Sequence, residues 1–136
     1  MNHIFTQIDD WSDAMIDDPA SSAKVRELND KLRQTLTGGT VVMTAGIIAL
    51  APDKQAEVLA KVRAFDAFTN DNDPWNEHDM GVFEIEVPGP GFGGTVTERV
   101  MWKVDYFDLT RAYMSDDPAD PTITERVLTI MLASEY

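Results

Sequence analysis

The chain has 136 residues, a formal net charge of −13 and no cysteine. The lack of cysteine excludes disulfides, thiolate zinc sites and cysteine nucleophiles, and it predicts a reducing, cytoplasmic location. The excess of acidic residues should repel nucleic acid and anionic membrane surfaces. We therefore expect a basic protein as partner, and neither direct nucleic-acid binding nor membrane binding.

The charge is unevenly distributed along the chain. Residues 1–22 hold five acidic residues and no Lys or Arg, and residues 23–63 hold seven basic residues against four acidic ones. Residues 64–136 hold 15 acidic residues against four basic ones. Such segregation produces a directional field that can orient a charged partner.

The first segment, residues 1–22, is predicted to be an acidic extension of the main domain. Its apolar residues recur at helical spacing within the 3–17 part and predict a short helix: Ile4, Ile8, Trp11 and Met15. The "DDPASS" that follows is interpreted as a linker, because Pro19 disfavours helix at the residue before it. Residues 23–136 are expected to form a single domain.

The first half of this domain predicts two helices around a strand. A helical apolar stripe covers residues 22–37, and the glycines of "TGG" end it. The β-branched "TVVMTA" at 40–45 predicts a buried strand. Pro52 suits the first position of a further helix, which is expected to run from Lys54 to Phe68.

The second half predicts a hairpin and a final helix. "GVFEIEV" at 81–87 alternates between apolar and polar residues, and "PGPGFGG" connects it to a returning strand at 96–108. Residues 109–114 are interpreted as a further short strand and 115–121 as a turn. A last helix is predicted from Pro121 or Thr122, with an apolar stripe made of Ile123, Val127, Ile130 and Met131.

These elements predict an α+β fold, in which an antiparallel sheet of three or four strands is covered by helices as a two-layer sandwich. The side chains expected in its core come from strands and helices alike. They are Val41, Leu59, Phe83, Ile85, Trp102, Val104, Val127 and Met131.

Three stretches resemble a known family: "FDAFTNDNDPWNEHDMGVFEI", "WKVDYFD" and above all "DPADPTITERVLTIMLASEY". The chain is similar, over about residues 24–136, to a bacterial domain-of-unknown-function family of small proteins, many of them carried by plasmids and other mobile elements. The resemblance implies no activity. It implies a genetic setting beside antirestriction-type genes, and so a role in conflict between host and mobile element.

The acidic loop at 68–81 invites a metal or catalytic interpretation. An EF-hand would need a ligand and then a glycine where Trp75 and Asn76 stand, and a glutamate at Val82, so no metal site is predicted. His78 lies between two acidic residues, but a second motif histidine and a G-x-S-x-G are both missing. The glycine-rich "GPGFGG" lies between strands and has no lysine after it, so no cofactor is expected.

Carboxylates accept bidentate hydrogen bonds from arginine as phosphates do, so acidic residues can imitate nucleic acid. The leading hypothesis is a non-enzymatic inhibitor that occupies the basic groove of a nucleic-acid-binding defence protein. Two alternatives remain: a small hydrolase or ligand-binding enzyme around His78, Asp79 and Lys103, and a structural subunit in which the loop residues only form turns. The predicted partner-binding residues are Asp71, Asp73, Trp75, Glu77, Asp79, Asp116, Asp117 and Asp120.

Overall fold

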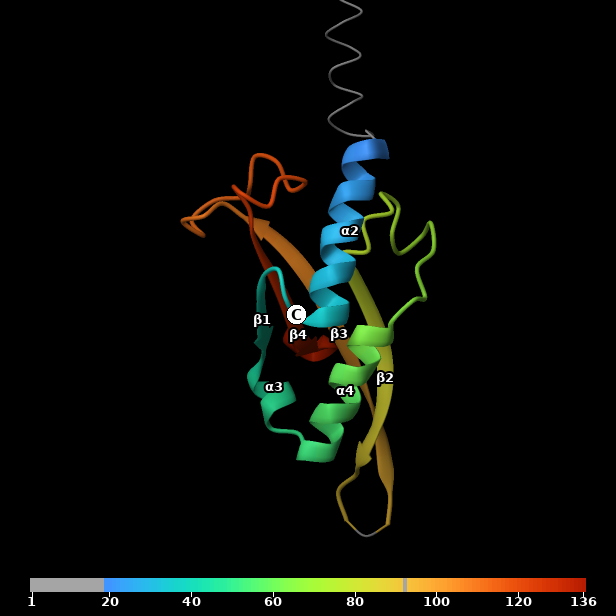
Figure 1. The fold of residues 1–136 in the computed structure, drawn as a ribbon. Helices are drawn as coiled ribbons and strands as arrows, with labels where there is room; N and C mark the ends of the chain where they lie inside the picture. Colours follow the sequence, from blue (N-terminus) through green and yellow to red (C-terminus); the bar gives the residue numbers. More distant parts are fainter. Residues whose placement is uncertain (1–18, 92) are drawn as a thin grey trace, which may run out of the picture.

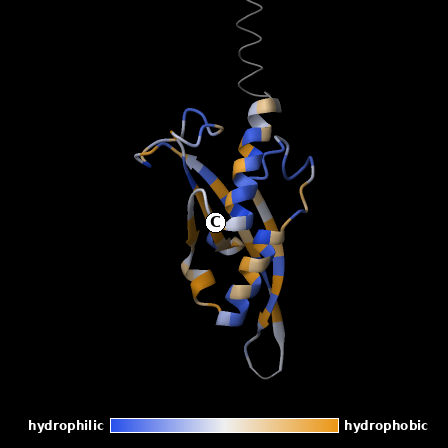
Figure 2. Ribbon diagram, in the orientation of Figure 1, coloured by the Kyte–Doolittle hydropathy of each residue, from blue (hydrophilic) through white to orange (hydrophobic). Residues whose placement is uncertain are grey.

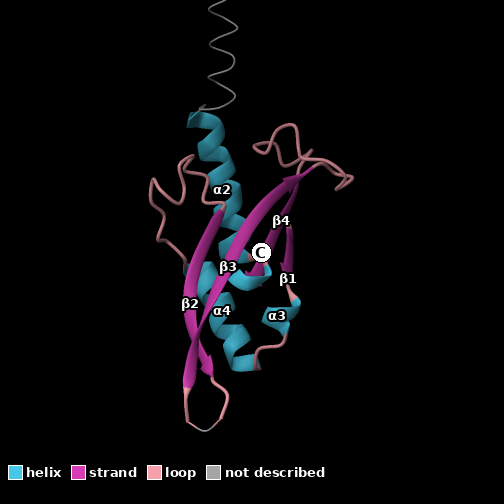
Figure 3. Cartoon of the chain, turned by 180° about the vertical axis from the view of Figure 1, so that it is seen from behind, coloured by secondary structure: helices cyan, strands magenta, loops and turns pink. Residues whose placement is uncertain are grey.

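The computed structural model describes residues 19–91 and 93–136, and it confirms an α+β fold of one sheet covered by helices (Figures 1 and 3). The elements follow one another as α2 (Pro19–Thr35), β1 (Thr40–Met43), α3 (Ala45–Ile48), α4 (Pro52–Ala64), β2 (Met80–Pro88), β3 (Thr95–Phe107), β4 (Glu125–Leu132) and the 3-10 helix η1 (Ala133–Glu135). None of the helices in the described part of the chain is long and apolar enough to cross a membrane.

The sheet has four strands in the order β1-β4-β3-β2. The β2–β3 hairpin and the β3–β4 pair are antiparallel, whereas β1 runs parallel to β4. The predicted antiparallel sheet is thus confirmed for two of its three strand pairs, and the β1–β4 pair makes the sheet mixed. The crossover through α3 and α4 takes the chain from β1 at one edge to β2 at the other, and β2 runs in the same direction as β1 (Figure 1). Two antiparallel steps, β2 to β3 and β3 to β4, then give β4 the direction of β1.

The main core lies between the sheet and the two longer helices. Leu32 of α2 and Val58 and Val62 of α4 pack against Trp102 and Leu128 of the sheet, and all five are fully buried. Alternation along β2 and β3 sends apolar side chains to this face and polar ones to the other, visible as alternating colours along the strands (Figure 2). Burial of this apolar face provides the main stabilising contribution to the fold.

Most of the predicted core residues occupy this cluster. Ile85, Trp102 and Val104 are buried in it, and Val41, Leu59 and Phe83 pack against it while partly buried. Val127 and Met131 are also buried, but they alternate with Leu128 and Ile130 and so lie on the opposite face of β4.

The predicted last helix is wrong, because Glu125–Leu132 forms the central strand β4. A central strand is buried on both faces, so its apolar residues form a continuous run instead of alternating. Because every residue of such a run is apolar, the residues at helical spacing are apolar as well. Periodicity alone therefore cannot distinguish a helix from a strand that is buried on both faces.

Three smaller differences concern the ends of elements. The predicted strand at 109–114 is wrong, since only an isolated bridge between Phe107 and Met114 forms there. Helix α2 begins at Pro19, inside the expected linker, and α4 ends at Ala64 instead of continuing to Phe68. The predicted helix at 3–17 lies outside the described residues.

Candidate functional site

Two long loops lie on either side of the N-terminal half of α2, at the same end of the sheet (Figure 1). The 66–79 loop connects α4 to β2, and the 108–124 loop connects β3 to β4. Arg26 of α2 donates a hydrogen bond to the carbonyl oxygen of Asn76 in the first loop, at 3.1 Å. The fold thus brings to one end two acidic stretches that are distant in sequence.

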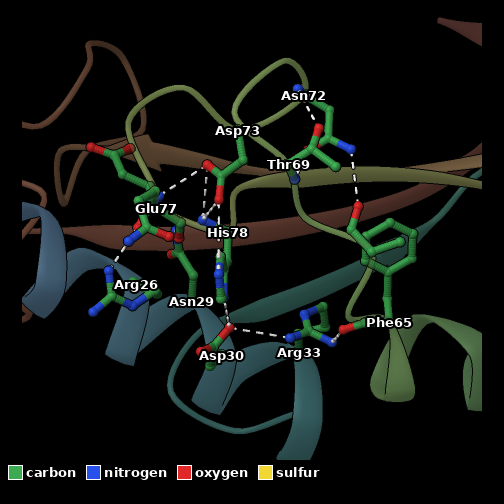
Figure 4. A network of polar contacts seen from close by, with 12 residues as sticks. Arg26, Asn29, Asp30, Arg33, Phe65, Thr69, Asn72, Asp73, Glu77 and His78 are labelled. Atoms are coloured by element: carbon green, nitrogen blue, oxygen red, sulfur yellow. Dashed lines mark hydrogen bonds and ion pairs between the residues drawn. The ribbon is translucent and has the colours of Figure 1, made fainter.

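The 66–79 loop is built by its own polar side chains. The Asn72 side chain accepts a hydrogen bond from the Thr69 amide at 2.8 Å and donates one to the Ala67 carbonyl at 3.0 Å. The buried Asp73 carboxylate accepts from the amides of Glu77, at 3.0 Å, and His78, at 3.2 Å (Figure 4). These bonds are the turn-forming bonds typical of Asn and Asp, and they hold the backbone where His78 has a φ of +55°.

His78 connects this loop to α2. Its ring stacks on Phe68, with centroids 3.8 Å apart and an interplanar angle of 4°. Its Nδ1 lies 2.8 Å from Asp30 Oδ1, and its Nε2 lies 3.8 Å from Asp73 Oδ2. Both ring nitrogens thus face carboxylates of the protein itself (Figure 4).

Arg33 fixes the start of the same loop. Its guanidinium is fully buried and donates to the carbonyl oxygens of Val62, Arg63 and Phe65 at 2.9–3.1 Å. These are carbonyls at the C-terminal end of α4, where helix bonding ends and a cation is favoured. Arg33 also pairs with Asp30 at 3.1 Å, so the partner of His78 is itself held in place.

A second network joins the loop to the sheet through Asn29. The Asn29 side chain donates to the Tyr106 hydroxyl at 2.8 Å and to the Glu77 carbonyl at 3.0 Å, and it accepts from Arg126 Nε at 2.7 Å. The Tyr106 hydroxyl donates to the Glu77 carboxylate at 3.1 Å. Arg126 further donates to the Pro118 carbonyl, so one network holds both loops.

Burial governs the ionisation of this network. Loss of hydration raises the pKa of the Glu77 and Asp79 carboxyls, and the negative charge of the neighbouring Asp73 adds to both shifts. Burial also raises the pKa of Tyr106 and lowers the pKa of Arg126. Glu77 and Asp79 are half-buried, so their charges are only partly displayed at the surface.

The 108–124 loop uses its carboxylates locally. Asp108 accepts from the Thr110 hydroxyl at 2.7 Å, and Asp120 accepts from both the amide and the hydroxyl of Thr122 at 2.9 and 2.6 Å. These hydrogen bonds lower the pKa of Asp108 and of Asp120. Asp117 accepts from the Ala119 amide at 3.1 Å. All four bonds close short turns within the loop.

Large apolar side chains on these two loops are exposed to solvent. Trp75 is 50% exposed in the first loop, and Leu109, Tyr113 and Met114 are 64%, 74% and 61% exposed in the second. The sequence reasoning found Trp75 but missed the other three, because a strand was predicted at 109–114. The signal that could have found them is the surrounding "DLTRAYMSDD", which is too polar for a buried strand.

The eight predicted partner-binding residues divide into two groups. Asp71, Trp75, Asp116 and Asp117 are exposed. Asp73 is buried, and Glu77, Asp79 and Asp120 are of intermediate exposure. Within residues 19–91 and 93–136, no three His, Asp or Glu side chains are grouped so that they could hold a metal ion.

The fold and its loops define a small α+β domain with an acidic, partly apolar end. Residues 43–135 match the family described as Protein of unknown function (DUF3768), and the chain belongs to that family. No curated protein and no solved structure matches the chain.

Proposed function

We propose that this protein is a non-enzymatic protein-binding module that uses its two-loop end to bind a basic protein. The observation that carries the proposal is the exposure of Trp75, Leu109, Tyr113 and Met114 on loops that also expose carboxylates. Exposed apolar side chains on a rigid framework are typical of interaction surfaces, and Trp, Tyr and Met are enriched at the centres of interfaces.

The two kinds of side chain have separate roles in this proposal. Tyr113 and Trp75 serve as anchors that become buried in the partner and supply most of the affinity. Asp71, Asp116 and Asp117 surround them as rim charges, and together with the net charge of −13 they accelerate encounter with a basic surface. The same negative charge repels nucleic acid, which is therefore disfavoured as a direct partner.

The partner class we propose is a nucleic-acid-binding protein. Exposed carboxylates can take the place of phosphates against arginine, since both accept paired hydrogen bonds from a guanidinium. The resemblance to proteins carried by mobile elements favours a host defence protein as the target, which would make the chain an inhibitor of antirestriction or anti-CRISPR type. The identity of the partner as a defence protein adds to the binding proposal. If that identity is wrong, the proposal of a protein-binding module still stands.

The experiment is affinity capture from a host lysate with nuclease treatment, followed by binding assays with the purified captured protein. Tyr113→Ser should weaken binding about tenfold or more, whereas Tyr136→Ser should not. Tyr136 is the matched control, because the two tyrosines are 74% and 79% exposed. Equal effects of the two substitutions would contradict the proposed site.

A second pair of variants tests the role of charge. Asp117→Lys should slow association and flatten its dependence on salt, while Asp53→Lys, a single reversal at the start of α4, should have little effect. If the captured partner binds no nucleic acid, the proposed partner class is contradicted, while the proposal of a protein-binding module stands. Association unaffected by salt and by Asp117→Lys would contradict a basic partner.

A further inference from the structure

Strand β2 forms one edge of the sheet, away from the two-loop end that carries the proposed function. It is nine residues long and pairs with β3 along its full length without a bulge. An edge strand presents unpaired backbone groups that can pair with another chain. We propose that the outer edge of β2 binds an extended peptide segment of a partner, with Lys or Arg at alternate positions, by addition of a fifth strand.

The alternation of hydrogen-bonded and non-bonded pairs between β2 and β3 shows which backbone groups of β2 point away from β3. The Gly89 amide donates to Gly94 at 2.9 Å, and the Val104 amide donates to Asp79 at 2.8 Å, so pairs at odd-numbered β2 positions are hydrogen-bonded. In an antiparallel pair, bonded and non-bonded positions alternate. The N–H and C=O groups of Val82, Glu84 and Glu86 therefore point outward along the edge.

The surface next to these residues is hollowed, and the hollow reaches Thr97 of β3. A hollow of about 190 Å³ lies between α4 and the middle of β2. Lys54, Glu57 and Lys61 line it on the α4 side, and Glu84, Ile85 and Glu86 line it on the β2 side. Lys54 and Glu57 form an ion pair at 3.0 Å, so the net charge of this wall is that of Lys61.

Charge favours a basic occupant, next to the Arg99 that already lies opposite Glu84 and the Thr97 hydroxyl that bonds to Glu86. Glu84 and Glu86 alternate with Ile85 and are both exposed on the sheet face opposite the helices. In an added strand, the residues opposite them lie on that same face, and opposite charges across a strand pair are stabilising. The residue between them faces α4 and meets Ile85. The preferred segment is basic, apolar, basic.

A second copy of the chain is the competing occupant, and its own charge opposes it. Antiparallel pairing of two β2 strands would set the glutamates of one copy against those of the other on the same face. Like charges directly opposite each other are destabilising, so pairing of two β2 strands is disfavoured and pairing with a basic segment is favoured.

The test uses the full chain and three synthetic peptides: TKVKVKT, its acidic counterpart TEVEVET, and TKVKVKT methylated on alternate backbone nitrogens. Hydrogen exchange of individual amides is measured by NMR with each peptide. The basic peptide should slow exchange of the Glu84 and Glu86 amides about tenfold, while those of Phe83 and Ile85, already bonded to β3, change little. The acidic and methylated peptides should leave the exchange of all four amides unchanged.

Two variants complete the experiment. Glu84→Lys with Glu86→Lys should reverse the preference to the acidic peptide, and the matched reversal Asp71→Lys with Asp117→Lys at the other end should not. Binding of the basic peptide without protection of the edge amides would mean attraction by net charge alone and would overturn the proposal. Edge protection that depends on protein concentration without peptide would identify a second copy as the occupant and would also overturn it.

Discussion

The 66–79 and 108–124 loops have similar acidic compositions, lie at the same end of the molecule and use their carboxylates in opposite ways. In the first, Asp73 is buried and Glu77 and Asp79 are half-buried in networks that reach α2 and β3. In the second, the Asp108 and Asp120 carboxylates accept from Thr110 and Thr122, two positions further along the same loop. The first loop is a structural part of the domain, and the second is a projecting surface.

The difference shows that a count of acidic residues does not measure an acidic surface. A carboxylate that accepts backbone amides inside the protein stabilises a turn, and its charge is no longer available to a partner. Exposed apolar side chains follow the same division, since four of the five on these loops, Leu109, Tyr113, Met114 and Ile123, belong to 108–124. We therefore place the main binding contribution on the 108–124 loop, with Trp75 as the contribution of the other.

The largest expected effect comes from the arginines associated with each loop. Arg33→Met removes three charge-assisted hydrogen bonds to carbonyls at the C-terminal end of α4 and should lower the free energy of unfolding by about 3 kcal/mol. Arg111→Met, in the 108–124 loop, removes an exposed pair with Glu125 and should cost about 0.5 kcal/mol. Urea unfolding measures both, and equal costs would contradict the division between the loops.

A smaller effect is expected from the acidic residues themselves. Asp73→Ala leaves the buried amides of Glu77 and His78 without an acceptor and should cost about 2 kcal/mol. Asp117→Ala removes one bond on an exposed turn and should cost about 0.5 kcal/mol. The same unfolding assay compares them, and a larger loss for Asp117→Ala would reverse our assignment of the structural loop.

The two loops should also respond to pH with opposite signs. Burial raises the pKa of Glu77 above its usual 4.5, so the folded state holds this proton more tightly than the unfolded state. Its stabilising contribution is present below pH 4.5 and is lost as pH rises through the folded pKa. Glu77→Gln, which keeps an acceptor for Tyr106, should therefore gain stability relative to wild type as pH rises towards neutrality.

Asp120 provides the matched opposite case. Hydrogen bonds from Thr122 lower its pKa below the usual 3.8, so its stabilising contribution is present above pH 3.8 and is lost as pH falls through the folded pKa. Asp120→Asn should therefore lose stability relative to wild type at neutral pH and recover it in acid. Unfolding curves from about pH 3 to pH 7 test both variants, and pH trends of the same sign would contradict the comparison.

The smallest expected effect on stability belongs to the proposed anchors. Tyr113→Ser and Trp75→Ser should change the free energy of unfolding by less than about 0.5 and 1 kcal/mol respectively, because neither side chain is buried. Circular dichroism melting measures this. A large destabilisation by Tyr113→Ser would mean that any binding defect of this variant reports on folding instead of on contact with a partner.

The parts of the fold that sequence predicted are those whose pattern is local. The alternation around Ile85 and Trp102 identified the β2–β3 hairpin, because one face of each strand is apolar and the other polar. Strand β4 was mistaken for a helix because it is buried on both faces. Its parallel pairing with β1 has no local sign, since it depends on contacts between distant residues.

The site shows the same limit. The sequence indicated that 66–79 is rich in turn-forming and acidic residues, but it could not show which carboxylates point inward. That orientation depends on Asn29 and Asp30 of α2, 48 positions from the Glu77 and His78 atoms that they contact, and on Tyr106 of β3. A resemblance to a family without established activity could not supply these contacts.

The position of β4 sets an order for folding during synthesis. Thr44 donates to the carbonyl of Ile130, 86 positions later, where the chain leaves β1. Until residues 125–132 emerge from the ribosome, β1 has no strand to pair with. The edge of β3 that later bonds to β4 is also unpaired. Insertion of β4 between two waiting strands is a non-local step, which is intrinsically slow. A nascent chain arrested before residue 125 should therefore be a substrate for chaperones, whereas one released after residue 132 should not.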